Sequence, residues 1–331
     1  MGIIKDGLYL LANKKYINYF KQKAIFPYYH IVSDNKVPHI NNLYNFKNID
    51  QFKNDLDFLI KNYNSLDPNT LCDNKKPKNS FLLSFDDGLQ EIYSVIYPIL
   101  KEKNIKAVFF INPDFVDNKK SLYKHDLSII IDHLKNNQSS QETIIEFKML
   151  FSSEISSNIE IIKELRKVNF SNRKKVEKAA KILKVDIPKY LLEEQPYISS
   201  EEIKEMIADG FYFGAHTMSH PPLKELDFIE QKKEIIDSID FMKSKFNINY
   251  SFFAFPFSDK FISKKLLDEL FSYDSNILLF GNSGIKKDVD ERIIQRFSLE
   301  KPNKLTEKLI VTEYLYSYYN RIIGKYRIER K

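Results

Sequence analysis

The chain has 331 residues, of which 43% are hydrophobic and 29% charged, and its formal net charge is +6. This length can bury a full core, and α/β barrels of this size are routinely one domain. The positive residues are spread along the chain rather than gathered into one stripe, so the charge does not predict nucleic-acid binding. Cys72 is the only cysteine, which excludes an intrachain disulfide and a thiolate metal site and favours a reducing compartment.

The N-terminal segment does not have the pattern of a leader peptide. Its apolar run at residues 8–12 precedes Lys14 and Lys15 and is too short for a signal sequence, and no apolar stretch reaches 18 residues. We therefore expect a cytoplasmic protein without membrane spans. Residues 8–20 have two interpretations, a helix packed on the body of the protein or an amphipathic helix in peripheral contact with a membrane.

The first predicted strand lies in residues 25–32 and contains Tyr29 and His30. A helix is expected to follow, with Asp50 as its N-cap. Its apolar positions recur at helical spacing, at Phe52, Leu56, Leu59 and Ile60.

The second predicted strand, residues 81–85, ends directly before Asp86 and Asp87. A helix over residues 92–100 and a third strand over residues 107–111 follow it. This alternation of strand and helix is typical of a parallel α/β fold.

Between residues 113 and 196 the sequence is rich in Ser, Asn and Lys and has helical periodicity without a clear strand. We expect a helical insertion after the third strand, placed so that it shapes one wall of a binding cleft. Its histidines, His125 and His133, are expected to be surface or packing residues. The periodicity is clearest in residues 127–134, 144–151 and 176–183.

The strand and helix pattern then resumes. A capping box formed by Ser199 and Glu202 opens a helix that ends near Gly210, and a strand at residues 212–215 leads into His216. The later predicted elements are a helix at 230–246, strands at 252–255, 277–280 and 293–297, and a helical tail at 305–319.

Two segments together supply side chains that suit a catalytic metal. Such a zinc site uses three protein ligands and one open position, and Asp87, His216 and His220 are of the right types. Asp86 points away from Asp87 in an extended backbone, so it could take a proton from a metal-bound water without being a ligand. Both segments follow predicted strands, whose C-terminal ends carry the site in α/β folds. Alone, each segment is more typical of a turn or of a packed histidine pair.

The SFDDG segment at residues 84–88 and the HTMSHP segment at residues 216–221 resemble the first two motifs of the polysaccharide deacetylase family, also called the NodB-homology family or carbohydrate esterase family 4. The FAFPFS segment at residues 253–258 resembles the third. This similarity implies a distorted (β/α)7-type barrel, here with a helical insertion after the third strand. We expect one catalytic domain over residues 1–331, with the insertion at about 113–196.

The resemblance implies roles for these residues. Asp87, His216 and His220 would bind a divalent metal, usually Zn2+, although the same ligands accept Co2+ or Ni2+. Asp86 would be the general base. A backbone N–H just past Pro256, around Phe257, would stabilise the oxyanion. The implied reaction removes an acyl group, most often acetyl, from the nitrogen of an amino sugar.

The chain departs from the usual family pattern at the general acid, which is normally a histidine near the C-terminus of the domain. No histidine follows His220. Tyr29 and His30 resemble the opening motif of a branch with permuted motif order, in which the N-terminal histidine is the acid. We therefore expect His30 to protonate the leaving amine, with His39 as a second candidate. The alternative for His30 is a histidine that caps a strand or packs in the barrel mouth.

A second departure concerns the arginine that orients the catalytic aspartate in many relatives. Ala254 or Phe255 stands in its place before the third-motif proline. Arg296, on the late strand, is a candidate substitute that could approach Asp86. The alternative is a solvent-exposed strand arginine.

Three classes of function remain open from the sequence. The leading one is a metal-dependent N-deacetylase acting on a cell-surface glycan or on its nucleotide-linked or lipid-linked precursor, with a deformylase as a near neighbour. The second is a catalytically impaired carbohydrate-binding or assembly module that keeps the fold. The third is an unrelated metal-binding protein. The sequence specifies neither the sugar, the metal nor the oligomeric state.

Overall fold

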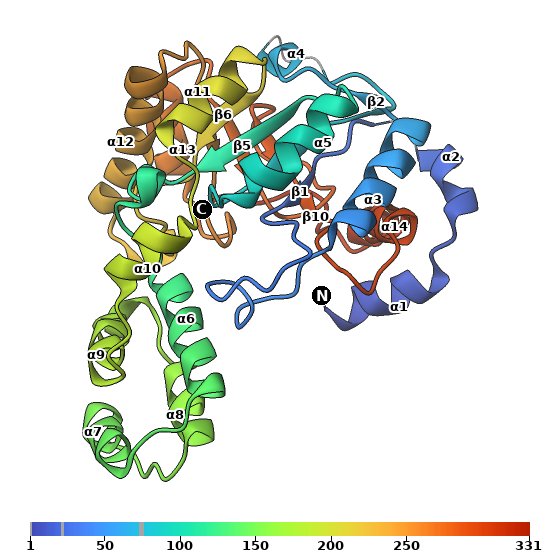
Figure 1. The fold of residues 1–331 in the computed structure, drawn as a ribbon. Coiled ribbons are helices and arrows are strands. Elements are labelled where there is room, and N and C mark those ends of the chain that lie inside the picture. Colours follow the sequence, from blue (N-terminus) through green and yellow to red (C-terminus); the bar gives the residue numbers. More distant parts are fainter. Residues whose placement is uncertain (1, 21–22, 73–75) are drawn as a thin grey trace.

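The computed structural model describes residues 2–20, 23–72 and 76–331. Its centre is a sheet of eight short parallel strands surrounded by helices (Figure 1). In order across the sheet the strands are β10 (Phe297–Ser298), β1 (Pro27–Tyr29), β4 (Leu83–Phe85), β5 (Ala107–Ile111), β6 (Tyr212–Ala215), β7 (Phe252–Ala254), β8 (Leu278–Gly281) and β9 (Ile293–Gln295).

The two edge strands of this sheet belong to one segment of the chain. β9 pairs with β8, β10 pairs with β1, and only Arg296 separates β9 from β10. The segment therefore joins the two edges and nearly closes the sheet into a barrel. Counted as one bent strand it gives seven strands, which confirms the distorted (β/α)7-type barrel.

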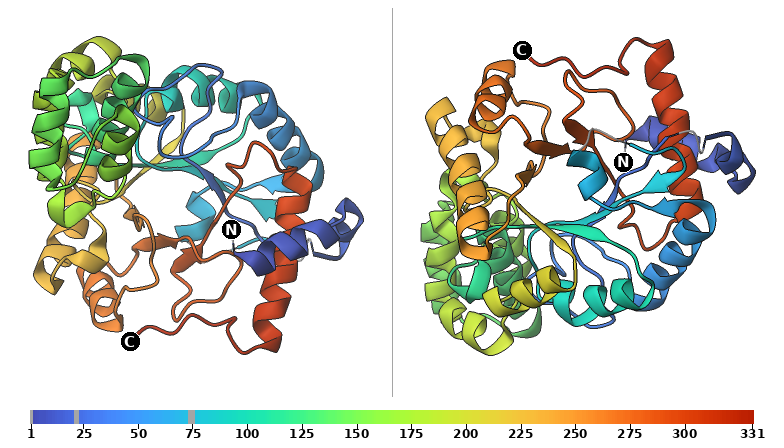
Figure 2. Two further views of the ribbon diagram at one scale, coloured as in Figure 1. Left: turned by 90° about the horizontal axis from the view of Figure 1, so that it is seen from below. Right: turned by 90° about the horizontal axis from the view of Figure 1, so that it is seen from above.

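Helices pack around the outside of the barrel, as both views in Figure 2 show. The helix predicted after β1 begins earlier than expected, because Asn48 rather than Asp50 is its N-cap, in a capping box with Gln51. The helix after β4 is divided, since Pro98 lacks the N–H that a regular turn needs and a π-helical turn precedes it. The outer elements are α3 (Ile49–Asn62), η2 (Ile92–Ile96), α5 (Tyr97–Glu102), α11 (Ser200–Ala208), α12 (Phe228–Phe246), α13 (Lys264–Tyr273) and α14 (Thr306–Ile322).

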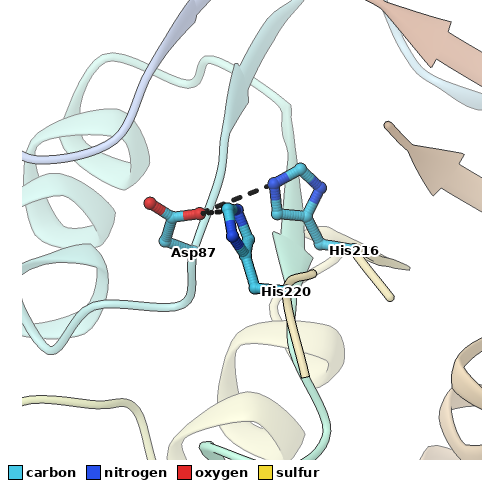
Figure 3. A group of neighbouring side chains, drawn as sticks. All are labelled: Asp87, His216 and His220. Carbon is cyan, nitrogen blue, oxygen red and sulfur yellow. Dashed lines mark ion pairs between the residues drawn. The ribbon is translucent and has the colours of Figure 1, made fainter. Parts of the chain in front are cut away.

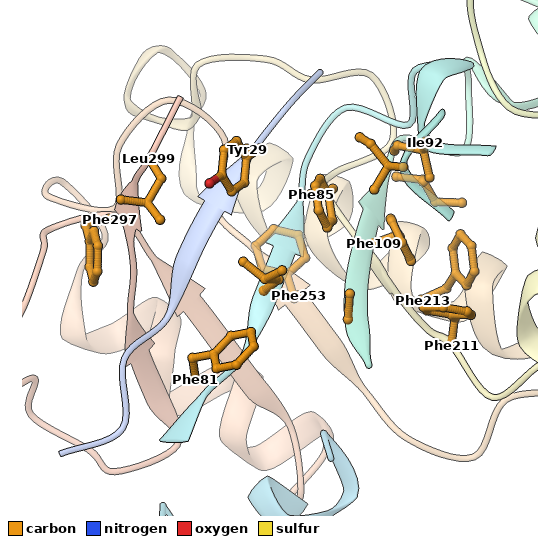
Figure 4. Packing of buried hydrophobic residues seen from close by; sticks show 14 of the residues in the cluster. Tyr29, Phe81, Phe85, Ile92, Phe109, Phe211, Phe213, Phe253, Phe297 and Leu299 are labelled. Atoms are coloured by element: carbon orange, nitrogen blue, oxygen red, sulfur yellow. The ribbon is translucent and has the colours of Figure 1, made fainter. Parts of the chain in front are cut away.

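Alternating strand residues fill two separate cores. Phe85, Phe109 and Phe213 point outward beneath the helices (Figure 4), where Phe85 stacks on Phe109 at 5.2 Å between ring centroids and Phe213 packs at a tilt 5.3 Å from Phe109. Phe110 and Phe280 belong to a second cluster, which fills the barrel itself. Because both faces are buried, the strands are apolar at nearly every position.

The insertion after the third barrel strand is confirmed. Its helices extend from one end of the barrel (Figure 1) and enclose a hydrophobic core of their own, which contains Ile130, Phe147 and Leu165. That the whole chain forms a single domain stays a prediction. Between β5 and α11 the elements are η3 (Val116–Asn118), α6 (Tyr123–Asn136), α7 (Gln141–Phe151), α8 (Asn158–Leu165), η4 (Phe170–Asn172), α9 (Lys174–Ile182) and α10 (Ile187–Glu194).

The N-terminal segment packs on the C-terminal helix α14. The single helix expected over residues 8–20 is wrong: α1 (Ile3–Leu11) starts earlier, and Asn13 caps a new turn, η1 (Lys14–Tyr16), before α2 (Ile17–Phe20). Lys5 of α1 pairs with Glu313 of α14 at 2.5 Å, whereas apolar side chains on the other side of α1 are exposed. Over the described ranges, no helix is both long and apolar enough to cross a bilayer. The remaining elements are α4 (Asn69–Cys72) and a two-stranded sheet of β2 (Asn64–Ser65) and β3 (Ser80–Phe81).

Candidate active site

Asp87, His216 and His220 converge at the C-terminal ends of β4 and β6 (Figure 3). The Nε2 atoms of His216 and His220 lie 3.5 and 3.2 Å from Oδ1 of Asp87. The three candidate ligand atoms are all within 4.8 Å of one another, and all three side chains are buried. One cation could therefore contact all three.

The hydrogen bonds of this group fit a metal ligand set. Nδ1–H of His216 donates to the carbonyl oxygen of Ala254 at 2.8 Å, which leaves the lone pair on Nε2 facing Asp87. Among the described residues, the buried Oδ1 of Asp87 has no hydrogen-bond partner. Although burial opposes its charge, the two imidazoles hold the pKa of Asp87 well below its usual range. An ionised, unsatisfied carboxylate beside two imidazoles, one of them oriented by a backbone carbonyl oxygen, suits a divalent cation.

The backbone around the group is strained in the way functional sites often are. Asp87, Thr217 and His220 have φ angles of 74°, 66° and 57°, a left-handed conformation that is uncommon for residues other than glycine. Asn112, directly after β5, supports this turn by donating from Nδ2 to the carbonyl oxygens of His216 and Thr217.

Steric crowding explains why the first motif ends in a glycine. Gly88 also has a positive φ, 67°, and a Cβ atom there would lie 2.9 Å from Cγ2 of Ile111. A larger residue would therefore displace the backbone that presents Asp87.

Arg296 lies beside Asp86, as the sequence suggested, and is only 1% exposed. Its NH1 donates to Oδ1 of Asp86 at 2.7 Å and its NH2 to Oδ2 at 2.9 Å, while Ser84 and Gly281 accept further bonds. Burial opposes the charge of Asp86, but the guanidinium keeps its pKa below the ordinary value. The alternative of a solvent-exposed strand arginine is wrong.

His30 follows β1 and forms an ion pair with Glu300, with 2.6 Å between Nδ1 and Oε2. Oε1 of Glu300 also accepts the backbone N–H groups of His30 and Ile31 at 3.0 and 2.9 Å. Burial disfavours the imidazolium, but the Glu300 carboxylate outweighs it and raises the pKa of His30 to about 10. His30 is thus fixed in orientation and protonated near neutral pH.

Phe257 stands at the end of the third-motif loop with a φ of 54°. Its ring meets the ring of His220 edge to face, with centroids 4.6 Å apart, and its carbonyl oxygen accepts a bond from Asn282 at 2.6 Å. The loop turns at Pro256, where Ser258 N–H donates back to the Pro256 carbonyl oxygen.

These groups open on one cavity of about 560 Å³. Its barrel side includes Asp86, Asp87, His30 and Phe257, and its other wall comes from the insertion. The residues contributed by the insertion are Leu122, Lys124, His125, Leu127, Ile131, Arg166 and Val168.

The other histidines differ in their surroundings. Nδ1 of His39 is bonded to the Tyr190 hydroxyl at 3.0 Å, and His39 is not part of the cavity wall. His125 lines the cavity but is held by the Tyr197 hydroxyl at 2.7 Å, and burial lowers its pKa to about 4. His133 lies on α6 beside Asn137, near the surface.

Sequence reasoning missed Glu300, Asn112 and Lys124. Glu300 follows β10, and only the pairing of β10 with β1 brings it to His30. Asn112 directly follows a confirmed strand, so its position was a usable signal. Lys124 belongs to the insertion, where the sequence contains no motif.

Comparison with known proteins decides the family. The model of the polysaccharide deacetylase family matches residues 73–128 and 154–274, which is more than half of the chain. This chain belongs to the polysaccharide deacetylase family. The family match includes Asp86, Asp87, His216 and His220.

Two solved structures illustrate the shared fold. The Streptococcus pyogenes deacetylase PplD, in complex with acetate, is 18% identical, with a TM-score of 0.56 over 88% of this chain and 98% of its own. IcaB from Ammonifex degensii is 16% identical, with a TM-score of 0.53 over 88% and 97%. Bacillus subtilis (strain 168) YxkH, whose name refers to a polysaccharide deacetylase, is 32% identical over 108 residues, 28% of this chain, and the match spans only 39% of that relative's length.

Proposed function

We propose that this protein is a metal-dependent hydrolase that removes an N-acyl group, acetyl in the first instance, from an amino sugar. The observation that carries the proposal is the Asp87, His216 and His220 group, which shares one cavity with Asp86 and His30. The cavity thus combines a metal ligand set with a candidate base and a candidate acid.

Asp87, His216 and His220 would hold the metal, with zinc as the first candidate and cobalt or nickel as alternatives. When bound, such a cation polarises the acyl oxygen and lowers the pKa of a coordinated water towards about 7. The hydrogen bond from His216 to Ala254 keeps one imidazole in the tautomer that can bind it.

Asp86 acts as the general base. Arg296 contacts both of its oxygens, and each oxygen keeps a second lone pair that can accept a proton. The arginine holds the carboxylate ionised and fixed in direction, so Asp86 can take the proton of the attacking water.

His30 acts as the general acid. Because Glu300 keeps its imidazole protonated, His30 can donate a proton to the sugar nitrogen as the bond to the acyl carbon breaks. The Phe257 N–H, for which no acceptor is found within the described part of the chain, is the candidate donor to the oxyanion, beside Pro256.

The substrate is an amino-sugar-containing glycan or its nucleotide-linked or lipid-linked precursor. A catalytically impaired binding module is the less favoured alternative, since Arg296 and the His30 and Glu300 pair are candidates for the two roles whose usual motif residues this chain lacks. A cytoplasmic location and peripheral membrane contact stay predictions.

Acetate release from N-acetylated glucosamine oligomers, with zinc-loaded and with EDTA-treated protein, tests the proposal. His30→Ala should abolish release and keep metal content, whereas Asp87→Ala should lose both, and His133→Ala is the matched control. Undiminished turnover in His30→Ala would show that His30 is not the general acid. Zinc binding that survives Asp87→Ala would contradict the ligand set.

A further inference from the structure

Two positively charged side chains of the insertion line the cavity. Lys124 is the second residue of α6, and Arg166 directly follows α8. Neither is within ion-pair distance of a carboxylate in the described residues. Their neighbours Lys120 and Lys167 differ, since they pair with Asp114 at 2.8 Å and Glu164 at 2.6 Å.

Lys124 lies close to the proposed chemistry. Its Nζ is 4.7 Å from the centroid of the Phe257 ring, and that ring contacts His220. Burial lowers the pKa of Lys124, so its ammonium group has lost part of its hydration. A partly dehydrated cation without a carboxylate partner is costly, and a bound anion would offset that cost.

No carboxylate of the described residues forms an ion pair with Lys124. Asp86 is held by Arg296 and Glu300 by His30, while Asp87 lies against the two imidazoles. Asp87 and Glu225 attract the Lys124 ammonium group only as charges beyond ion-pair distance. A bound anion would therefore be the first direct ionic partner of Lys124.

Arg166, an exposed residue, supplies a second cation to the same cavity. Leu127, Ile131 and Val168 of the insertion line the same wall. A guanidinium binds phosphate through two parallel N–H groups, and an ammonium binds it as a point charge. The wall thus has the composition of a phosphate subsite beside an apolar surface.

We propose that Lys124 and Arg166 bind a phosphate group attached to the substrate sugar, so that the preferred substrate is an N-acyl amino sugar phosphate or diphosphate rather than a neutral glycan. This inference rests on the proposed function, because it concerns the substrate of the same site. The phosphate contact adds binding energy next to the reacting N-acyl group and selects against uncharged sugars.

The test compares N-acetylglucosamine 1-phosphate with methyl N-acetylglucosaminide as substrates of the zinc-loaded protein. Wild type should have a kcat/KM at least about tenfold higher for the phosphate, as expected for one charge-assisted contact. Lys124→Met and Arg166→Gln should each lower kcat/KM for the phosphate, mainly through KM, by a clearly larger factor than for the neutral sugar. Lys120→Met and Lys167→Gln are the matched controls. Calorimetric titration of the metal-free protein with the same two sugars reports binding apart from turnover.

The outcomes separate the two proposals. Equal turnover of both sugars, or an equal loss on both in Lys124→Met, overturns the phosphate subsite and leaves the proposed deacylation intact. Binding of the sugar phosphate that depends on Lys124, without turnover of either sugar, supports the subsite and counts against deacylation. Absence of both binding and turnover overturns the subsite. A UDP-linked and a prenyl-diphosphate-linked N-acetylglucosamine then distinguish a nucleotide carrier from a lipid carrier.

Discussion

At the residue scale, Arg296 and Asp86 form a buried ion pair at the edge of the cavity. Its guanidinium contacts both oxygens of Asp86, and Ser84 and the Gly281 carbonyl oxygen accept two further N–H groups. A lysine ammonium group acts as a point charge and would not bond both oxygens in parallel. It would therefore not fix the orientation of the carboxylate as the planar guanidinium fork does. The geometry of the proposed base therefore depends on the fork as well as on the charge.

Arg296→Lys should lower kcat by about 100-fold, because a small misplacement of the base has an effect of that order. Zinc content should stay unchanged, since the ligands are other residues. Steady-state kinetics and metal analysis measure the two quantities, with Arg292→Lys as a control, whose guanidinium pairs with Asp290. An unchanged kcat in Arg296→Lys contradicts the positioning role.

Glu300→Gln should move the alkaline limb of the rate profile to lower pH. The Glu300 carboxylate raises the pKa of His30 to about 10, and a general acid is active only while protonated, so the rate falls as pH rises through that pKa. The amide removes the negative charge and lowers the pKa of His30, so the limb should shift by more than about one unit.

The protonation of His30 should also make the stability of the fold decrease as pH rises. The raised pKa of His30 stabilises the fold fully below its unfolded value of about 6.5, and this contribution is lost as pH rises through about 10.

Profiles of kcat against pH for wild type and Glu300→Gln check the predicted shift of the alkaline limb. Coincident alkaline limbs would show that His30 is not the acid.

The sequence could locate Asp86, Asp87, His216 and His220, because each follows a strand with a readable apolar pattern. It could not locate Glu300, whose contact with His30 crosses between segments 270 residues apart. The left-handed backbone of these motifs was also unpredictable, since it depends on support from neighbouring loops.

At the element scale, the insertion has its own hydrophobic core. Phe147 of α7 is fully buried there and stacks on Phe151, while Met149 of the same helix is 68% exposed. Because the barrel cores are separate clusters, damage to this core should stay local.

Phe147→Ala should destabilise the insertion by about 3–5 kcal/mol, as expected for a buried aromatic side chain, and Met149→Ala should have an effect within about 0.5 kcal/mol. Hydrogen exchange should show faster opening of α6 to α9 with little change in β4 and β5. Equal loss of protection in the barrel strands would show that the two cores unfold together.

Helix positions were predictable where a cap and an apolar stripe coincide. The capping box of Ser199 and Glu202 is confirmed and opens α11. The insertion helices α8 and α10 escaped prediction, because they are only 8 residues long and their apolar patterns are weak. In α1 the exposed side chains Ile3 and Leu10 leave the membrane interpretation open as a prediction, which co-sedimentation with anionic vesicles would test.

At the scale of the whole molecule, the C-terminal segment is anchored by a fully buried charge cluster. Arg330 pairs with Asp259 at 2.5 Å and with Asp288 at 2.6 Å, and Gln295 of β9 donates to both carboxylates. Burial opposes the charge of Asp259, but Arg330 lowers its pKa below the ordinary value. The cluster connects the tail to the third-motif loop and to the closing strand.

Arg330→Met should destabilise the protein by about 3–5 kcal/mol at pH 7, because two carboxylates stay buried without their cation. The depressed pKa of Asp259 stabilises the wild type above its unfolded value of about 3.8, and this contribution is lost as pH falls through the folded pKa. The difference between variant and wild type should therefore persist at pH 4 and shrink only below about pH 3.8, for example at about pH 3. Urea unfolding at neutral pH and at this lower pH measures it, with exposed Arg327→Met as control, and a difference independent of pH would contradict the ionic account.

The barrel class followed from the alternation of strands and helices together with the family motifs. The closure of the barrel did not, because β9 and β10 are three and two residues long, and their pairing depends on a bend at Arg296 that no local pattern encodes. Short strands in a closed sheet carry too few residues for a reliable periodicity.

The proposed metal ligands and the guanidinium that holds Asp86 belong to different parts of the barrel. Asp87 and His216 follow β4 and β6, which both pair with β5. Arg296 lies instead between β9 and β10, where the barrel closes. If β9 and β10 came away from the barrel, the proposed ligands could still bind a cation, but Asp86 would lose its contact with Arg296. If the proposed function holds, full activity would therefore require the closed barrel.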